Sequence, residues 1–268
     1  MPSSKPIGVF DSGIGGLTVA HEIIRQLPNE SIIYFGDTAR VPYGPKSAAT
    51  VCRYSREITS YLRDQDVKAI VIACNTATAH ALPVLRQELP VPVIGVVEPG
   101  ARAALRASSG GHIGVIGTSG TIRSGAYEQA IHAIDPDAKV IARACPLFVP
   151  LVEEGWIDHP VTLLVAQEYV GPLVRERINT LVLGCTHYPL LKDVLCRALG
   201  PEIALIDSAA ETASELGRVL EEGGLEAPRD QAAASHRFIA SDDPLQFLQL
   251  GQRFLGDAIE SVQIHTFI

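Results

Sequence analysis

Two cysteines in this 268-residue chain are followed by similar polar residues. Each stands at the end of an apolar run, IVIA or LVLG, and the two segments read Cys74, Asn75, Thr76 and Cys185, Thr186, His187. A thiol at the end of a buried strand is often only a small apolar side chain, but two thiols at matching positions favour a chemical role. A helix that starts directly after a thiol directs its amide N–H groups toward the sulfur, which lowers the pKa of the thiol.

A pair of thiols is suited to inverting a carbon atom. One thiolate removes a proton from one face of the carbon, and the other thiol returns a proton to the opposite face. Each sulfur must approach the carbon to about 3–3.5 Å, so we expect the sulfurs of Cys74 and Cys185 to lie about 7 Å apart. That separation excludes a disulfide, whose bond is about 2 Å long.

The same residues have two other possible uses. Cys74, Cys185 and His187 could bind zinc, although the chain lacks the closely spaced CxxC pairs of zinc sites, and we expect no metal. A Cys–His hydrolase would use one thiol only, with His187 as its base. His187 could also be a structural histidine.

A glycine-rich turn, DSGIGG, runs from Asp11 to Gly16. Glycines at the start of a helix suit phosphate binding, but this turn lacks the lysine and the spacing of the known phosphate loops, and the leading carboxylate would repel an anion. We expect Asp11 to hold or deprotonate a nearby thiol, and Ser12 to bind substrate.

Two further segments contain candidate residues. The Pro- and Gly-rich loop GDTARVPYG (36–44) is of the kind that lies over a binding site, although it could be a plain surface turn. In PLFVPLVEEG, Glu153 is a candidate secondary acid, and sequence alone does not separate it from Glu154.

Short apolar runs alternate with amphipathic segments along the chain. Such runs are typical of strands buried on both faces of a parallel sheet, and their alternation with helices predicts a doubly wound α/β fold. We expect strands at 7–10, 31–35, 69–73, 91–97, 112–117, 139–144, 180–184 and 203–206, with helices at 47–65, 77–88, 122–133, 161–177 and 188–199.

An internal repeat divides the chain into two similar halves. Four pairs of segments match in order at nearly one offset of about 110 residues, and they centre on Asp11 and Thr118, Pro42 and Pro150, Cys74 and Cys185, and Glu98 and Asp207. The alternative is that all strand–helix units look alike. Because each motif follows a strand, it should lie at the carboxyl edge of a sheet, where such folds bind ligands.

The repeat predicts two pseudo-symmetric α/β/α lobes with the active site in the cleft between them. Lobe A comprises residues 1–97 and 208–268, and lobe B comprises residues 98–207. In the returning part of lobe A, further strands are expected at 236–241 and 261–267, with a helix starting at the DDP sequence (242–244).

Composition excludes several classes of function. The net charge of −8 and the pI of about 5.5 argue against nucleic-acid binding. The N-terminus has no signal-peptide pattern, and no apolar stretch is long enough to span a membrane. Five widely spread cysteines then indicate a reduced, cytoplasmic protein.

The motifs together resemble those of the glutamate racemases, within the aspartate/glutamate racemase superfamily. The resemblance extends from about residue 7 to 216 and rests on GVFDSGIGGLTV, DTARVPYG, ACNTAT, GVVEPG, IGTSGTIRSGAY and GCTHYPLL. It implies a cofactor-independent isomerase that interconverts L- and D-glutamate and supplies D-glutamate for peptidoglycan, and hence for cell wall biogenesis and cell shape. A homodimer is a further expectation from the family. Some members with an N-terminal extension are activated by a cell-wall precursor. The DSG motif here begins at Asp11, so the resemblance does not extend to that activation.

By the same resemblance, each cysteine is the acid/base residue for one enantiomer. Asp11 and His187 assist the thiols, and Glu153 is an auxiliary. The implied substrate contacts are Asp11, Ser12, Tyr43, Gly44, Asn75, Thr76, Thr118, Thr121, Thr186 and His187.

The lysines agree with a cofactor-free reaction. Many racemases bind pyridoxal phosphate through a lysine, and none of the five lysines here lies in a repeated motif. A related racemase acting on aspartate or a hydantoin remains an alternative, as does a two-lobed amino-acid-binding protein without catalysis.

Overall fold

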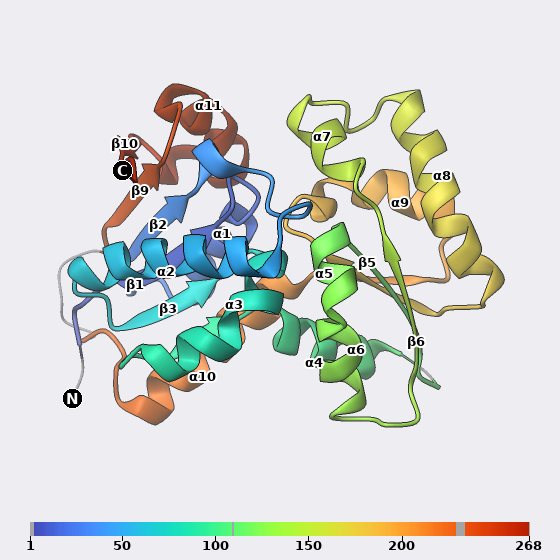
Figure 1. Ribbon diagram of the computed structural model, residues 1–268, viewed down its shortest axis with the longest axis horizontal. Coiled ribbons are helices and arrows are strands. Elements are labelled where there is room, and N and C mark those ends of the chain that lie inside the picture. Colours follow the sequence, from blue (N-terminus) through green and yellow to red (C-terminus); the bar gives the residue numbers. More distant parts are fainter. Residues whose placement is uncertain (1–2, 109, 229–233, 268) are drawn as a thin grey trace. The chain divides into compact units, whose positions relative to one another are not determined.

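The computed structural model describes residues 3–108, 110–228 and 234–267. The chain divides into two compact units, and the boundaries fall in the segments that follow β4 and β8. Unit 1 comprises Met1–Val96 and Ala209–Ile268, and unit 2 comprises Val97–Ser208. Figure 1 shows that each unit is a sheet covered by helices.

Unit 1 contains a six-stranded sheet in the order β10-β9-β2-β1-β3-β4, with every pairing parallel. Its strands are β1 (Ile7–Asp11), β2 (Ile32–Gly36), β3 (Ala69–Ile72), β4 (Val93–Gly95), β9 (His236–Ala240) and β10 (Gln263–Ile264). Most of the strands expected from apolar runs are therefore confirmed. Two are much shorter than expected: 91–97 gives only three strand residues, with helix α4 already beginning at Val97, and 261–267 gives only Gln263–Ile264.

The sheet of unit 1 is buried on both faces because alternate side chains enter two different cores. Ile7 and Val9 pack on one face, while Phe10 packs on the other. Helices α1 (Leu17–Gln26), α10 (Ser208–Gly223) and α11 (Pro244–Leu255) cover the first face, and α2 (Ala48–Asp64) and α3 (Asn75–Glu88) cover the second. Helix α11 begins at the expected place, with the Asp243 side chain capping it.

Unit 2 repeats the central part of this topology. Its parallel sheet has the order β6-β5-β7-β8, which corresponds to β2-β1-β3-β4 in unit 1. The matching strand order confirms the internal repeat, and the three-layer α/β architecture was predicted correctly. The strands are β5 (His112–Gly117), β6 (Lys139–Ala144), β7 (Thr180–Gly184) and β8 (Ala204–Ile206).

Two helical layers cover the sheet of unit 2. One face packs against α4 (Val97–Ala107), α5 (Ser119–Ser124) and α6 (Ala126–His132), and the other against α7 (Phe148–Glu153), α8 (Pro160–Arg175) and α9 (Lys192–Leu199). The single helix expected at 122–133 is wrong, because Gly125 adopts a left-handed conformation (φ 66°) and separates α5 from α6.

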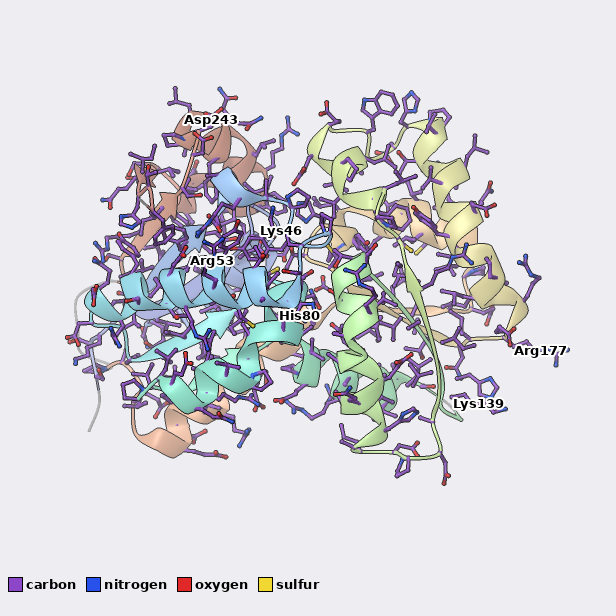
Figure 2. All side chains as sticks on the ribbon, viewed as in Figure 1. Lys46, Arg53, His80, Lys139, Arg177 and Asp243 are labelled. Atoms are coloured by element: carbon purple, nitrogen blue, oxygen red, sulfur yellow. The ribbon has the colours of Figure 1, made fainter. Side chains whose placement is uncertain are left out.

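Charged side chains are spread over both units. Figure 2 labels the basic residues Lys46, Arg53, Lys139 and Arg177, which come from a bend, a helix, a strand and the turn after another helix. Within the described ranges, no helix has the length and apolar character needed to cross a membrane.

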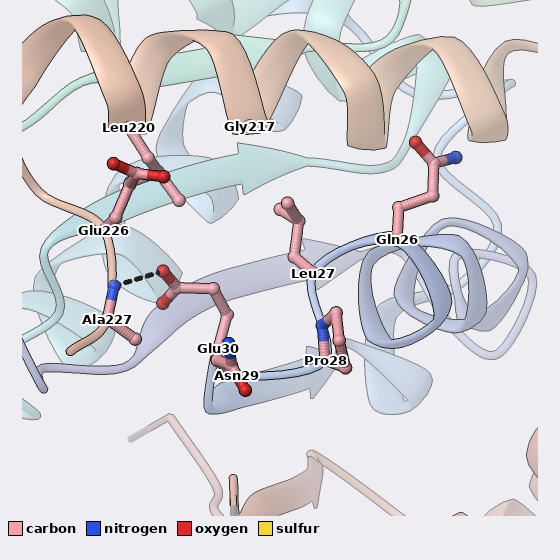
Figure 3. Close-up of a pocket in the computed structure, with 9 residues that line it drawn as sticks. All are labelled: Gln26, Leu27, Pro28, Asn29, Glu30, Gly217, Leu220, Glu226 and Ala227. Atoms are coloured by element: carbon pink, nitrogen blue, oxygen red, sulfur yellow. Dashed lines mark hydrogen bonds between the residues drawn. The ribbon is translucent and has the colours of Figure 1, made fainter. Parts of the chain in front are cut away.

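A buried ion pair joins distant segments of unit 1 at the amino edge of its sheet. Glu30 Oε2 lies 2.6 Å from Lys68 Nζ, and the two side chains are 5% and 2% exposed. Lys68 also donates to the carbonyl of Ser3, and Glu30 Oε1 accepts from the amide of Ala227 at 2.7 Å (Figure 3). The pair therefore holds the segments at Ser3 and Ala227 against the starts of β2 and β3.

Replacing Glu30 with Gln is expected to lower the free energy of unfolding by about 3–5 kcal/mol, because it leaves the Lys68 ammonium buried without its counter-charge. The exposed pair between Lys5 and Asp66 is the matched control, and Asp66→Asn should cost less than about 1 kcal/mol. Urea unfolding of the two variants measures both values. Equal losses of unfolding free energy in Glu30→Gln and Asp66→Asn would contradict the claim that burial makes the Glu30–Lys68 pair more important for stability.

Candidate active site

The candidate residues of unit 1 gather at the carboxyl edge of its sheet. Asp11 is the last residue of β1, and Cys74 follows β3 by two residues. Because β1 and β3 are paired, with Phe10 opposite Ile72, the two chain segments leave the sheet side by side. Cys74 Sγ lies 3.7 Å from Ser12 Oγ as a result.

Cys74 occupies the N-cap of helix α3. Its sulfur accepts a hydrogen bond from the amide of Ala77 at 3.4 Å, and the residue is only 5% exposed. Asn75 and Thr76, both buried, form the first turn of the helix. A helix N-terminus at this position favours the thiolate form of a cysteine.

Asp11 is a fully buried carboxylate in a tight turn. Its Oδ2 accepts from the amide of Gly13 at 2.9 Å, and the hydroxyl of Tyr34 donates to the Gly13 carbonyl. Burial raises the pKa of Tyr34, and the charges of Asp11 and Cys74 raise it further. A Cβ at Gly16 would lie 2.5 Å from Asp11 Cβ, so this glycine serves close packing around the carboxylate.

The loop after β2 contains a short helical turn, η1 (Thr38–Arg40), and then Tyr43 and Gly44. Tyr43 is buried and donates to Asp37 Oδ2, and its burial, together with the charge of Asp37, raises the pKa of the phenol. Asp37 was not among the sequence candidates. The structure shows it as the fully buried centre of this loop, bonded to Tyr43, Arg40 and Ser241.

The candidate residues of unit 2 gather at the equivalent edge of the other sheet. Thr118 follows β5 and Cys185 follows β7, directly after the paired residues Gly117 and Gly184. Thr118 caps α5 by accepting from the amide of Thr121 at 3.2 Å, and the two hydroxyls lie 3.1 Å apart. Both hydroxyls thus lie at the carboxyl end of β5, the strand paired with the one that precedes Cys185.

The Cys185 thiol lies next to a histidine. Its sulfur is 3.8 Å from His187 Nδ1, while His187 Nε2 is 3.2 Å from Glu153 Oε1. Glu153 therefore contacts the histidine, whereas Glu154 lines an apolar groove with Trp156. Cys185, Thr186 and His187 are all buried.

The surroundings of Cys185 differ from the sequence expectation in one respect. A 3-10 turn, η2 (Tyr188–Leu191), comes first, and α9 begins only at Lys192. Pro189 has no amide hydrogen and disfavours a helical residue before it, which delays the α-helix. The two thiols therefore have different partners, a helix N-terminus for Cys74 and an imidazole for Cys185.

The remaining cysteines do not resemble this pair. All five are free thiols, and burial raises the pKa of Cys145, which keeps this thiol neutral. Cys145 occupies the place in unit 2 that Asp37 has in unit 1, since the Cys145 amide donates to Gly117 and the Asp37 amide donates to Asp11. In unit 2, the hydroxyl of Tyr188 donates to the Cys145 carbonyl at 2.8 Å.

Across the described part of the chain, no group of three or more His, Cys, Asp or Glu side chains could hold a metal ion. The polar groups near the thiols are hydroxyls, amides, one imidazole and carboxylates. They are suited to moving protons and to holding the carboxylates and the amine of an amino acid.

Comparison with known proteins agrees with this chemistry. The model of the Asp/Glu/Hydantoin racemase family matches residues 7–216. The chain belongs to this family, which confirms the resemblance seen in the sequence motifs.

Named relatives cover almost the whole chain. A protein of Geobacter metallireducens called glutamate racemase is 55% identical over 96% of this chain and 95% of its own. The structure of glutamate racemase isoform RacE1 from Bacillus anthracis has a TM-score of 0.92 at 44% identity, covering 98% of this chain and 97% of its own. A glutamate racemase from Francisella tularensis in complex with D-glutamate has a TM-score of 0.91 at 39% identity, covering 98% of both chains.

Proposed function

We propose that this chain interconverts L- and D-glutamate without a cofactor, with Cys74 and Cys185 as the two acid/base groups. The observation that carries the proposal is the pair of buried thiols at equivalent strand ends of two repeated units. Relatives named glutamate racemase, among them one in complex with D-glutamate, support this choice of substrate.

The two units act as the lobes of one site in this proposal. Lobe A (1–97 and 208–268) brings Cys74, and lobe B (98–207) brings Cys185, to opposite faces of the α-carbon. One thiolate removes the α-proton to give a carbanion, and the other thiol donates its proton to the opposite face. After one turnover the thiol and the thiolate have exchanged places, so the enzyme is ready for the reverse reaction.

Each thiol has its own assisting groups. On the Cys74 side these are the amide of Ala77 and the carboxylate of Asp11. On the Cys185 side, His187 takes and returns the thiol proton, and Glu153 orients the imidazole through its contact with Nε2.

The carbanion requires strong stabilisation because no cofactor ring delocalises its charge. Hydrogen-bond donors in a site that excludes water provide this stabilisation. We assign the donors to the substrate α-carboxylate to Asn75, Thr76 and Thr186. The further substrate contacts that we propose are Asp11, Ser12, Tyr43, Gly44, Thr118, Thr121 and His187.

We also propose that the D-glutamate formed is used for peptidoglycan synthesis and that the protein acts in the cytoplasm. We also propose that two copies of the chain form a homodimer. The support for this assembly is the family resemblance, and multi-angle light scattering during gel filtration tests it.

The activity is tested by incubating the purified protein with L-glutamate in D₂O, without added cofactor, and analysing the product by proton NMR and chiral chromatography. We expect loss of the α-proton signal and formation of D-glutamate. L-Aspartate is run in parallel. Conversion of aspartate alone, or exchange without inversion, would contradict the proposal.

A further inference from the structure

The part of unit 1 that follows α10 contacts the loop after β2 at several points. Ser241, directly after β9, donates to Asp37 Oδ1 at 2.9 Å and accepts from the amide of Ala39 at 2.9 Å. The Thr38 hydroxyl donates to the Asp242 carbonyl and accepts from the Asp242 amide. In Figure 1, β9 lies beside β2, which brings these two strand ends together.

A second contact comes from the last described residues. The Arg40 guanidinium forms ion pairs with Asp37 and Glu57, and it lies 4.6 Å from the ring centre of Phe267 and 4.0 Å from that of Tyr54. The short strand β10 pairs with β9 and so places the last described residues beside it. The ring centres of Phe267 and Phe35 are 5.4 Å apart.

Unit 2 has no counterpart of these contacts among its described residues. Its sheet ends at β6, the counterpart of β2, whereas in unit 1 β9 and β10 extend the sheet beyond β2. The buried Cys145 then replaces Asp37 at the strand end. The strands β9 and β10 also lie outside residues 7–216, the part that matches the family model. Both features indicate that the segment containing β9 and β10 has a role specific to the 37–44 loop of unit 1.

The positions of the contacts around Asp37 indicate what this role is. The Asp37 carboxylate accepts a hydrogen bond from the Ser241 hydroxyl on one oxygen and from the Tyr43 hydroxyl on the other. This one carboxylate therefore connects the segment after β9 to the end of the loop. Asp37, Tyr43 and Ser241 are all buried, and Arg40 is 17% exposed at its side chain. Hydrogen bonds to a buried charge fix geometry more strictly than neutral surface contacts do.

We propose that residues 241–267 hold the 37–44 loop in the conformation that binds substrate, with Ser241 and Phe267 as positioning residues. Ser241 fixes the Asp37 carboxylate and the amide of Ala39, and Phe267 holds the Arg40 guanidinium. The link to glutamate rests on the proposed function, in which Tyr43 and Gly44 bind the substrate. The ordering of the loop itself does not depend on that function.

The test uses Phe267→Ala and Ser241→Ala in the full chain, with Phe267→Tyr to restore the ring and Ile264→Ala as the matched control. Ile264 lies in β10 with 60% exposure. Hydrogen–deuterium exchange of the 37–46 amides is measured by mass spectrometry, and KM and kcat are measured for both glutamate enantiomers.

We expect Phe267→Ala and Ser241→Ala to accelerate exchange in residues 37–46 and to raise KM about three- to tenfold for both enantiomers. The kcat values should change less than about twofold, because no reacting group is altered. Phe267→Tyr and Ile264→Ala should behave like the parent.

Two results would overturn the proposal. One is unchanged exchange and KM in both variants. The other is faster exchange throughout unit 1 with equal loss of kcat, which would mean general destabilisation. If the protein does not act on glutamate, the exchange in residues 37–46 still decides the positioning role, so this failure is distinct from failure of the proposed function.

Discussion

Replacing Cys74 with alanine is expected to abolish racemisation of glutamate, starting from either enantiomer, and replacing Cys185 is expected to do the same. Each direction needs one thiolate to remove a proton and one thiol to donate a proton. Loss of a positioned proton-transfer group costs about 10²–10⁴-fold in rate, and no neighbouring group occupies the same face of the carbon in this mechanism. Chiral chromatography from L- and from D-glutamate measures the loss.

The variants should differ in what they retain. The remaining thiol faces one side of the carbon, so each variant should slowly exchange the α-hydrogen of one enantiomer with solvent, and the enantiomer should differ between the two variants. Cys196→Ala is the control, because Cys196 is an exposed free thiol in α9. Substantial two-way racemisation by either Cys74→Ala or Cys185→Ala would refute the two-base mechanism.

Replacing His187 with asparagine is expected to lower kcat/KM about 100-fold in both directions. His187 Nδ1 is 3.8 Å from Cys185 Sγ, and asparagine cannot exchange a proton with that sulfur. The two enantiomers have equal free energies, so kcat/KM must fall equally for both. The difference between the assisting groups of Cys74 and Cys185 should therefore appear in the primary deuterium isotope effect and not in kcat/KM.

In His187→Asn, proton transfer to and from Cys185 should become rate-limiting. In Asp11→Asn, proton transfer to and from Cys74 should become rate-limiting. With α-deuterated glutamate, the primary isotope effect should rise for one enantiomer in the first variant and for the other enantiomer in the second. Glu153→Gln should cost less than His187→Asn, because Glu153 acts through the imidazole and its side chain is 34% exposed. A rise for the same enantiomer in both variants would contradict the assignment of one assisting set to each thiol.

The sequence was sufficient for the strands, because side chains buried on both faces leave unbroken apolar runs such as IGVF and TLVLG. The repeat in the motifs also predicted the shared strand order, since equivalent segments fold into equivalent units. Helix interruptions were harder to foresee. The break at Gly125 depends on a left-handed φ that an amphipathic pattern does not reveal.

Candidate residues next to strand ends were found because their position depends on local order along the chain. Cys74 and Ser12 come together through the pairing of β1 with β3, which the apolar runs imply. Asp37 was missed because its partner Ser241 is distant in sequence and belongs to no repeated motif. Its position directly after a strand, within a Pro- and Gly-rich loop, was the available signal.

The most direct test of the central claim is the position of deuterium in the earliest product of the unaltered protein in D₂O. If two thiols act from opposite faces, newly formed D-glutamate should contain deuterium at the α-carbon, while the remaining L-glutamate keeps its hydrogen, and the reverse should hold from D-glutamate. Mass spectrometry of the separated enantiomers at low conversion measures this distribution. Equal deuterium in the substrate and product enantiomers would show that a single base serves both faces, and would contradict the assignment of Cys74 and Cys185 as a pair.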